Sequence, residues 1–308
     1  MRILVTGASG QVGGVLAKRL AAFGKIAAPG RTAFDLSNID TIPAGLDAIS
    51  PDAIVNAAAY TAVERAEDEP ELTHRINADA PGAIGRWAAG RRVPVVHFST
   101  DYVFDGSGHA PWREHDNPAP LSVYGKSKLN GEQALRAAAG PHLIVRSSWI
   151  YHHAGTNFLR TIARLAAERE ELRIVGDQIG APISADAIGS TLAALLQKYG
   201  GSFSTLADLS HGTLHLTASG VASWHDFAVA IVAGLKARRA PVQAKRIVPI
   251  KTSEYPAKAR RPLNSRLDLT RVTELLGHTM PSWQSVLDRA LDNWPDLNVS
   301  TAANRPAI

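Results

Sequence analysis

Residues 2–13 read Arg-Ile-Leu-Val-Thr-Gly-Ala-Ser-Gly-Gln-Val-Gly. The run Arg2–Thr6 is apolar and β-branched, which favours a buried strand. Gly7, Gly10 and Gly13 follow with GxxGxxG spacing, and a helical pattern begins at Val15. Glycines here permit a tight turn and let backbone N–H groups approach a pyrophosphate at the helix N-terminus. The stretch predicts a nucleotide-binding strand, turn and helix, with a purely structural turn as the alternative.

Strands and helices alternate through the rest of the first half. Apolar runs typical of strands occur at 25–28, 52–56, 93–98 and 142–146, and helical patterns at 63–77, 82–89 and 124–139. This alternation predicts an α/β protein with a Rossmann-type doubly wound parallel sheet. The 308 residues are enough for a second, smaller C-terminal lobe.

Composition excludes several classes of protein. The net charge of +5 comes from scattered residues, which indicates a mild preference for anionic small molecules and no nucleic-acid stripe. Without cysteines there are no disulfides and no thiolate metal sites. No apolar run approaches the ~20 residues of a membrane span, and no leader precedes the first strand. We therefore expect a cytoplasmic protein without membrane contact.

Residues 121–132, Leu-Ser-Val-Tyr-Gly-Lys-Ser-Lys-Leu-Asn-Gly-Glu, carry a second chemical signal. Tyr124 and Lys128 are four residues apart in a helical pattern, so both side chains project from one face. A phenol ionises near pH ~10, and a nearby ammonium lowers that pKa by stabilising the phenolate. The pair predicts a proton donor that works near neutral pH. A surface tyrosine beside a solvated lysine is the alternative, because YxxxK is common.

The end of the second strand bears on the choice of dinucleotide. A NAD-selective site has an acidic residue there that binds the ribose hydroxyls, whereas this chain has Arg31. A guanidinium suits the additional ribose phosphate of NADP, so we expect NADPH, with NADH possible and a solvated arginine as the alternative. Asp35 and Leu36 are expected to flank the adenine ring.

Small or polar residues follow two further strands. Residues 56–60, Asn-Ala-Ala-Ala-Tyr, leave room for a flat cofactor in the crevice. Ser99, Thr100 and Asp101 follow the strand at 93–98, where hydroxyls point toward a substrate, although an ordinary turn would also favour them. His109 and His115 have no metal-ligand spacing, and no metal site is expected.

These motifs in this order resemble the extended short-chain dehydrogenase/reductase superfamily. Longer strings are similar to its dTDP-4-dehydrorhamnose reductase family. They lie at 10–13 (Gly-Gln-Val-Gly), 55–67, 97–106, 123–132 and 146–151. The resemblance extends over residues 1–293 or so.

The resemblance implies an NAD(P)-dependent oxidoreductase. It implies NADPH-dependent reduction of the C4 keto group of dTDP-4-dehydro-β-L-rhamnose to dTDP-β-L-rhamnose, the last step of dTDP-L-rhamnose synthesis for cell-envelope polysaccharide. Tyr124 would protonate the alkoxide formed at C4. Lys128 would lower the tyrosine pKa and hold the nicotinamide ribose. Thr100, with Ser99 as a second donor, would polarise the carbonyl.

Two sets of binding residues follow. The cofactor set is Gly7, Gly10, Gln11, Val12, Gly13, Arg31, Asp35, Leu36, Ala58, Ala59, Tyr60, Thr61, Tyr124 and Lys128. The substrate set is Thr100, Asp101, Trp149, Asp177, Gln178 and Arg261. Asp177 and Gln178 begin a string at 177–184 that is similar to the one by which the family holds the deoxynucleotide. Arg261 lies in a string similar to Arg-Pro-x-Asn-Ser-x-Leu and is expected to grip a diphosphate. Plain surface loops are the alternatives.

The expected domains are interleaved. We expect an NADP-binding Rossmann domain at 1–148 with returning segments at about 185–218, a substrate-binding lobe at 149–184 and 219–295, and a polar tail at 296–308.

One position departs from the family. Members that form a metal-bridged dimer carry a glutamate in the first helix, where this chain has Val15. An apolar side chain cannot ligate Mg²⁺, so we do not expect that site and predict a monomer or weak homodimer. The expected partner is a dTDP-sugar.

Two rival functions remain. Another nucleotide-sugar reductase or epimerase would share the first half but not the Asp177–Gln178 loop. A non-catalytic protein like the regulatory subunit of methionine adenosyltransferase would keep the nucleotide but has no need of the intact Ser/Thr, Tyr and Lys set.

Overall fold

The structure is a computed structural model that describes residues 1–295. The predicted polar tail lies outside the described residues. The strands are β1 (Arg2–Thr6), β2 (Lys25–Ala27), β3 (Ala53–Asn56), β4 (Val95–Thr100), β5 (His142–Ser147), β6 (Ile150–Tyr151), β7 (Glu171–Val175), β8 (Ile179–Gly180), β9 (Ile183–Ser184), β10 (Thr213–His215), β11 (Ala222–Ser223) and β12 (Arg246–Ile250). The α-helices are α1 (Gln11–Arg19), α2 (Ile42–Ile49), α3 (Val63–Ala66), α4 (Pro70–His74), α5 (Ala80–Ala89), α6 (Val123–Ala137), α7 (Phe158–Glu168), α8 (Ala185–Lys198), α9 (Phe203–Leu209), α10 (Trp224–Ala237), α11 (Thr270–Leu276) and α12 (Trp283–Asp292). The shorter turns are the 3₁₀ helices η1 (Leu20–Ala22), η2 (Ile39–Thr41), η4 (Asp101–Val103) and η5 (Thr252–Glu254), and the π-helix η3 (Arg75–Asp79).

A six-stranded sheet organises the first half, in the order β10-β5-β4-β3-β1-β2 with every neighbouring pair parallel. The chain moves from β1 outward to β2 and then returns to β3 on the other side of β1. The strand order therefore reverses between β1 and β3, and a crevice at the carboxyl ends of the strands is expected at such a point. The predicted doubly wound parallel sheet is confirmed.

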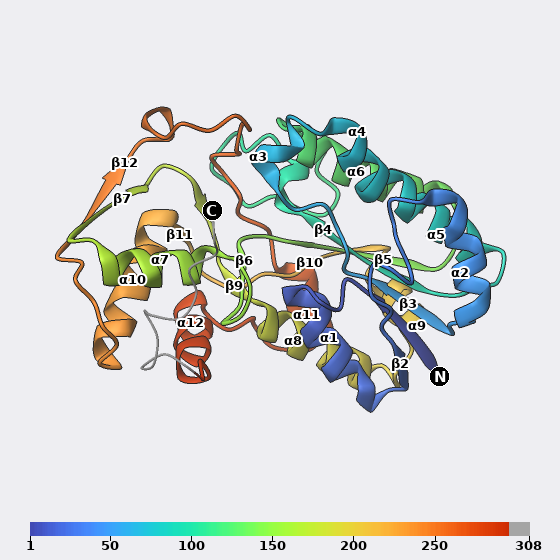
Figure 1. Ribbon diagram of the computed structural model, residues 1–308. Helices are drawn as coiled ribbons and strands as arrows, with labels where there is room; N and C mark the ends of the chain where they lie inside the picture. The colour runs from blue at the N-terminus through green and yellow to red at the C-terminus, as the bar shows by residue number, and fades with distance from the viewer. Residues whose placement is uncertain (296–308) are drawn as a thin grey trace.

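Helices cover both faces of the sheet (Figure 1). One face packs against α1, α8 and α9 through Leu16, Leu192 and Leu206, and the other against α2, α5 and α6 through residues such as Leu46 and Leu135. The strands are buried on both faces, which explains their continuous apolar runs.

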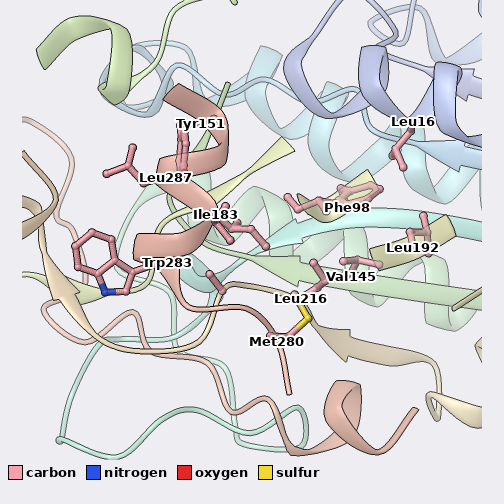
Figure 2. Close-up of a cluster of buried hydrophobic side chains, with 14 of the residues drawn as sticks. Leu16, Phe98, Val145, Tyr151, Ile183, Leu192, Leu216, Met280, Trp283 and Leu287 are labelled. Atoms are coloured by element: carbon pink, nitrogen blue, oxygen red, sulfur yellow. The ribbon is translucent and has the colours of Figure 1, made fainter. Parts of the chain in front are cut away.

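The first of these two cores continues into the C-terminal part of the chain. Figure 2 shows Phe98 and Val145 of the sheet near Leu216, with Ile183, Tyr151 and Leu287 extending the same buried cluster. The C-terminal elements β7, β12, α7, α10 and α12 gather at the opposite end of the molecule from β2 (Figure 1). β7 pairs in parallel with β12, and the cleft described below lies where the two parts meet.

Two predicted helices differ from those observed. The first begins at Gln11 rather than Val15, because Gly10 adopts an extended conformation and caps it. The single helix expected at 63–77 is instead α3 and α4 followed by the π-helix Arg75–Asp79. Pro70 causes the break, since its nitrogen has no hydrogen to continue the hydrogen-bond ladder of α3.

Within residues 1–295, no helix combines the length and the apolar character needed to cross a membrane.

Candidate active site

A cleft of about 1080 Å³ opens at the carboxyl ends of β1, β3, β4 and β5. Its walls include Gly7 after β1, Ala57 after β3, Thr100 at the end of β4 and Ser147 at the end of β5. The C-terminal part contributes Trp224 and other residues to the same cleft. One continuous space therefore spans the glycine turn and the Tyr124 helix.

The glycine turn packs tightly on itself and on the loop after β3. Gly7 has φ +67°, and a Cβ there would lie 2.7 Å from the Cα of Ala58. A Cβ on Gly13 would lie 2.2 Å from the Gly7 carbonyl oxygen. Helix α1 starts directly after Gly10, so its free N–H groups and positive dipole end face the cleft that Gly10 and Gln11 line. These features suit the pyrophosphate of a dinucleotide.

Arg31 and Asp35 lie at the far end of the cleft. The Arg31 Nε is 3.6 Å from Asp35 Oδ1, and the arginine side chain is 75% exposed. Asp35 also accepts hydrogen bonds from the backbone N–H and the hydroxyl of Ser37, which lower its pKa. Arg31 is thus free to reach a phosphate while Asp35 stays ionised and fixed. Both residues, with Leu36, line the cleft.

Helix α6 carries the predicted acid into the cleft. The Ser122 hydroxyl caps the helix by accepting from the backbone N–H of Gly125. Gly125 packs so closely against η4 that a Cβ would lie 2.3 Å from the Tyr102 carbonyl oxygen. The start of α6 is therefore held against the end of β4, which brings Tyr124 beside Thr100.

The Tyr124 pKa differs in direction from the prediction. Burial raises the pKa to about 12, a hydrogen bond with Thr100 lowers it, and the charge of Asp101 raises it. Lys128 does not lower it, because the ammonium is directed to the Phe98 carbonyl oxygen, 2.6 Å away. The predicted lowering of the pKa by Lys128 was wrong for this structure. A phenol with this pKa is fully protonated at neutral pH.

Lys128 is buried and partly discharged. It is 2% exposed, and burial lowers its pKa to about 8 while Glu132 raises it. Its Nζ also lies 3.4 Å from His97 Nε2. The ammonium lines the cleft one helical turn from Tyr124, so the predicted pair does share one face.

Thr100 and Asp101 lie side by side under the cleft. The Thr100 hydroxyl donates to Asp101 Oδ1 at 3.0 Å and accepts from the backbone N–H of Tyr102. Asp101 Oδ2 is buried and finds no hydrogen-bond partner within residues 1–295. Burial raises the Asp101 pKa to about 6. The nearby Ser265 hydroxyl opposes this rise, so the carboxyl group has neighbours from both parts of the chain.

The Ser99 hydroxyl is engaged in a hydrogen bond within the protein. Its hydroxyl donates to Glu132 Oε1 at 2.5 Å. Glu132 is fully buried, and Arg146 binds it through two hydrogen bonds of 2.9 and 2.7 Å. These bonds hold the pKa of Glu132 below its usual value despite burial. Ser99 lines the cleft, but its side chain anchors α6 to the sheet, which makes it a poor second donor to a carbonyl.

Two tryptophans form an aromatic wall. The rings of Trp149 and Trp224 stack 3.8 Å apart at 12°, and both line the cleft. The Trp224 indole N–H donates to Gln178 Oε1 at 3.1 Å. Asp177 accepts from the backbone N–H and hydroxyl of Thr252, whose hydroxyl also accepts from Gln178. Asp177 and Gln178 therefore stand behind the wall rather than in it.

Arg261 reaches the cleft from the C-terminal part. Its guanidinium donates to Glu64 at 2.8 Å, and Glu64 also accepts from the backbone N–H groups of Lys258 and Ala259. The Arg261 Nε is buried with no acceptor among the described residues. Glu64 was not predicted, because its partners lie more than 190 residues away in the sequence.

Most predicted site residues line this one cleft, and four do not: Gly13, Tyr60, Asp177 and Gln178. Gly13 packs against Gly7, and the Tyr60 hydroxyl donates to Glu69 at 2.7 Å. Val15, the position of the missing glutamate, is buried against Gly189 of α8.

Asn77 is a further residue that the sequence analysis missed. Its side chain accepts from the backbone N–H of Tyr60 and donates to the Tyr60 carbonyl and to the Ser127 hydroxyl. It sits in the π-helix η3, a distortion that often marks functional sites. An asparagine on a buried helix face was the only available signal. Asn77 ties the loop after β3 to α6.

The chain matches the family model described as RmlD substrate binding domain over residues 1–295. It is 44% identical over 293 residues to a dTDP-4-dehydrorhamnose reductase of Burkholderia thailandensis, covering 92% of this chain and 96% of that protein. A dTDP-4-dehydrorhamnose reductase of Escherichia coli is 40% identical, covering 95% of this chain and 97% of that protein.

A solved structure with a related sequence also has a similar fold. The dTDP-4-dehydrorhamnose reductase of Bacillus anthracis, in complex with NADP, superposes with a TM-score of 0.83 at 33% identity, covering 94% of this chain and 98% of that chain.

Proposed function

This chain belongs to the dTDP-4-dehydrorhamnose reductase family, and we propose that its cleft reduces the C4 ketone of dTDP-4-dehydro-β-L-rhamnose to dTDP-β-L-rhamnose with NADPH. The observation that carries the proposal is the joining of the glycine turn, Thr100, Tyr124 and Lys128 in one cleft. Such an arrangement combines a dinucleotide site with an acid beside a carbonyl donor.

NADPH, held by the glycine turn and by Arg31, supplies the hydride that reduces the ketone. Tyr124 gives its hydroxyl proton to the oxygen that becomes negative at C4. Its pKa of about 12 keeps the phenol protonated until then, yet leaves it far more acidic than an alcohol. The phenol is therefore in the protonated form that reduction requires.

Lys128 and Thr100 assist from two sides. The Lys128 ammonium, fixed against the Phe98 carbonyl, reaches the nicotinamide ribose of the bound cofactor. The Thr100 hydroxyl, which donates to Asp101 in this structure, turns its hydrogen to the ketone oxygen when the substrate binds. Ser99 is less suited to this role, because its hydroxyl is held in the shorter hydrogen bond to the buried Glu132.

The sugar nucleotide occupies the remaining part of the cleft. Asp101 and Trp149 line the sugar pocket, and the Trp149 ring covers the apolar face of the sugar. Arg261 donates to the diphosphate. Asp177 and Gln178 act on the nucleotide indirectly, by fixing Trp224.

Incubation of the purified protein with NADPH and dTDP-4-dehydrorhamnose tests the assignment. We expect loss of NADPH absorbance together with formation of dTDP-rhamnose. Oxidation only with a different keto-sugar would identify a neighbouring reductase. No oxidation with any keto-sugar would support the non-catalytic alternative.

The remaining assignments are also proposals. We propose a cytoplasmic location, a monomer or weak homodimer without Mg²⁺, and the interleaved division of the chain predicted above. The pairing of β10 with β5 and the packing of α8 against α1 support a returning segment at about 185–218. Sedimentation with and without EDTA tests the oligomeric state.

A further inference from the structure

A histidine with no exposed surface lies directly behind Lys128. His97 is in the middle of β4, is 0% exposed and does not line the cleft. Burial holds its pKa far below the usual value, so the ring is neutral. A neutral imidazole has one nitrogen that donates and one that accepts.

Both ring nitrogens have polar neighbours. His97 Nε2 lies 3.4 Å from Lys128 Nζ, and Nδ1 lies 3.1 Å from the side-chain amide of Asn56. The amide nitrogen faces Nδ1, and the amide oxygen accepts from the Thr6 hydroxyl at 2.6 Å, at the entrance to the glycine turn. A buried chain of side chains thus runs from the glycine turn through β3 and β4 to α6.

The ammonium determines which atoms donate and which accept along this series of side chains. A protonated lysine can only donate, so Nε2 must accept and the hydrogen of the ring must be on Nδ1. The Asn56 amide must then present its oxygen to Nδ1 and its nitrogen to Thr6. The structure has the amide the other way round, so a half-turn that exchanges its oxygen and nitrogen in place is required. The Thr6 hydroxyl oxygen then accepts from Asn56 as well as from the backbone N–H of Ala58.

We propose that His97, held as the Nδ1–H tautomer by Asn56, is the positioning residue for Lys128. The ammonium has three N–H bonds, and the Phe98 carbonyl and His97 Nε2 take two of them. The third is then directed into the cleft, where it can reach the ribose of the cofactor. The inference rests on the proposed function, because it specifies how that function's lysine is held.

Several charges face this pair. Glu132 acts on Lys128 from its own helix and is itself neutralised by Arg146 from β5. Arg136 of α6 acts on His97, and Asp101 of η4 acts on Tyr124. His97 is the neighbour from β4, and its loss removes an acceptor that stabilises the ammonium. The Lys128 pKa should fall as a result.

Two amide variants separate positioning from packing. In His97→Gln the amide reaches the place of Nε2 and can still accept from Lys128. In His97→Asn it reaches only the place of Nδ1. We expect His97→Asn to lower kcat about tenfold or more and to move the alkaline limb of the kcat profile to lower pH by about one unit, as loss of one hydrogen bond to a charged group predicts. His97→Gln should retain most activity and the wild-type limb.

His215→Asn is the matched control, since His215 is equally buried but lies against Phe104. Equal kcat and equal pH limbs in the two His97 variants, or the same shift in His215→Asn, would overturn the proposal. If the variants do not fold, the tautomer of His97 in the wild-type enzyme tests the proposal. ¹⁵N NMR should then detect the ring hydrogen on Nδ1. A ring hydrogen on Nε2 at neutral pH would contradict the proposal. Inactive wild-type protein with an Nδ1–H signal would refute the proposed function alone.

Discussion

The ring of Tyr102 meets the ring of Tyr124 edge to face, with centroids 5.8 Å apart and planes at 79°. The Tyr102 ring therefore covers part of the phenol. This contact reduces the access of water to Tyr124 and contributes to the burial that raises its pKa. Tyr102, like Tyr124, is half-buried, and burial raises its pKa as well.

Tyr124→Phe should lower kcat about 10³-fold, the scale expected for loss of a general acid. NADPH affinity should stay near wild type, because the ring keeps its packing against Tyr102. Stopped-flow turnover and NADPH fluorescence titration measure the two quantities. Tyr199→Phe, which removes a phenol bonded to Leu275 outside the cleft, is the control. Persistent turnover in Tyr124→Phe would mean that another group is the acid.

Activity and stability should respond to alkaline pH in opposite directions. Burial lowers the Lys128 pKa from 10.5 to about 8, so the ammonium and with it kcat should be lost above about pH 8. Between these two pKa values the unfolded chain binds more protons than the folded one. The contribution of Lys128 to the free energy of unfolding therefore rises from pH 8 to 10.5. Kinetic profiles and urea unfolding at matched pH check both, and a kcat loss that coincides with unfolding would contradict the assignment.

Arg31→Ala should weaken NADPH binding about tenfold and leave NADH binding unchanged, because only NADP has the ribose phosphate that the guanidinium meets. Titration with each cofactor gives the two affinities. Arg169→Ala, an exposed arginine outside the cleft, controls for net charge. Equal losses for NADPH and NADH would show that Arg31 does not recognise the phosphate.

Glu64→Gln should raise KM for the sugar nucleotide about tenfold with a smaller effect on kcat. Glu64 holds Arg261 and the backbone at Lys258 and Ala259, so its loss releases the arginine from the cleft wall. Steady-state kinetics at saturating NADPH measure the split. The exposed neighbour Glu71→Gln should behave as wild type. An unchanged KM in Glu64→Gln would remove Arg261 from the diphosphate site.

Gln178→Leu tests the support of the aromatic wall. Loss of the acceptor leaves the Trp224 indole N–H unpaired and loosens its stack on Trp149, which should raise KM several-fold. Tryptophan fluorescence should change together with KM. Gln197→Leu on the exposed side of α8 makes the same chemical change away from the cleft. A change of fluorescence without a change of KM would separate the wall from substrate binding.

The strand ends could be predicted from the sequence, because the carboxyl edge of a parallel sheet is where its loops converge. Gly7, Thr100 and Tyr124 therefore came together as expected. Their electrostatics could not be predicted in the same way. The four-residue spacing of Tyr124 and Lys128 suggested a lowered phenol pKa, whereas burial and the Phe98 carbonyl decide the outcome.

The contacts between the two parts of the chain could not be predicted from the sequence either. Glu64 and Arg261 are separated by 197 residues, and no local period encodes such a pair. Gln178 was assigned to the substrate from a motif, and in the structure its amide oxygen accepts from the Trp224 indole N–H. A motif identifies which residues belong to a site, while packing decides which of them line the cleft.

The position of β10 in the sequence has a consequence for folding during synthesis. This edge strand ends at His215. Helix α8 covers one face of the sheet and ends at Lys198, shortly before β10 in the sequence. A ribosome must therefore synthesise more than two thirds of the polypeptide before the last strand of the cofactor-binding sheet is available. Until then the apolar face under α8 remains uncovered in the nascent chain, which makes it a target for chaperones. A truncated product that ends before α8 would be a substrate for proteolysis rather than half an enzyme.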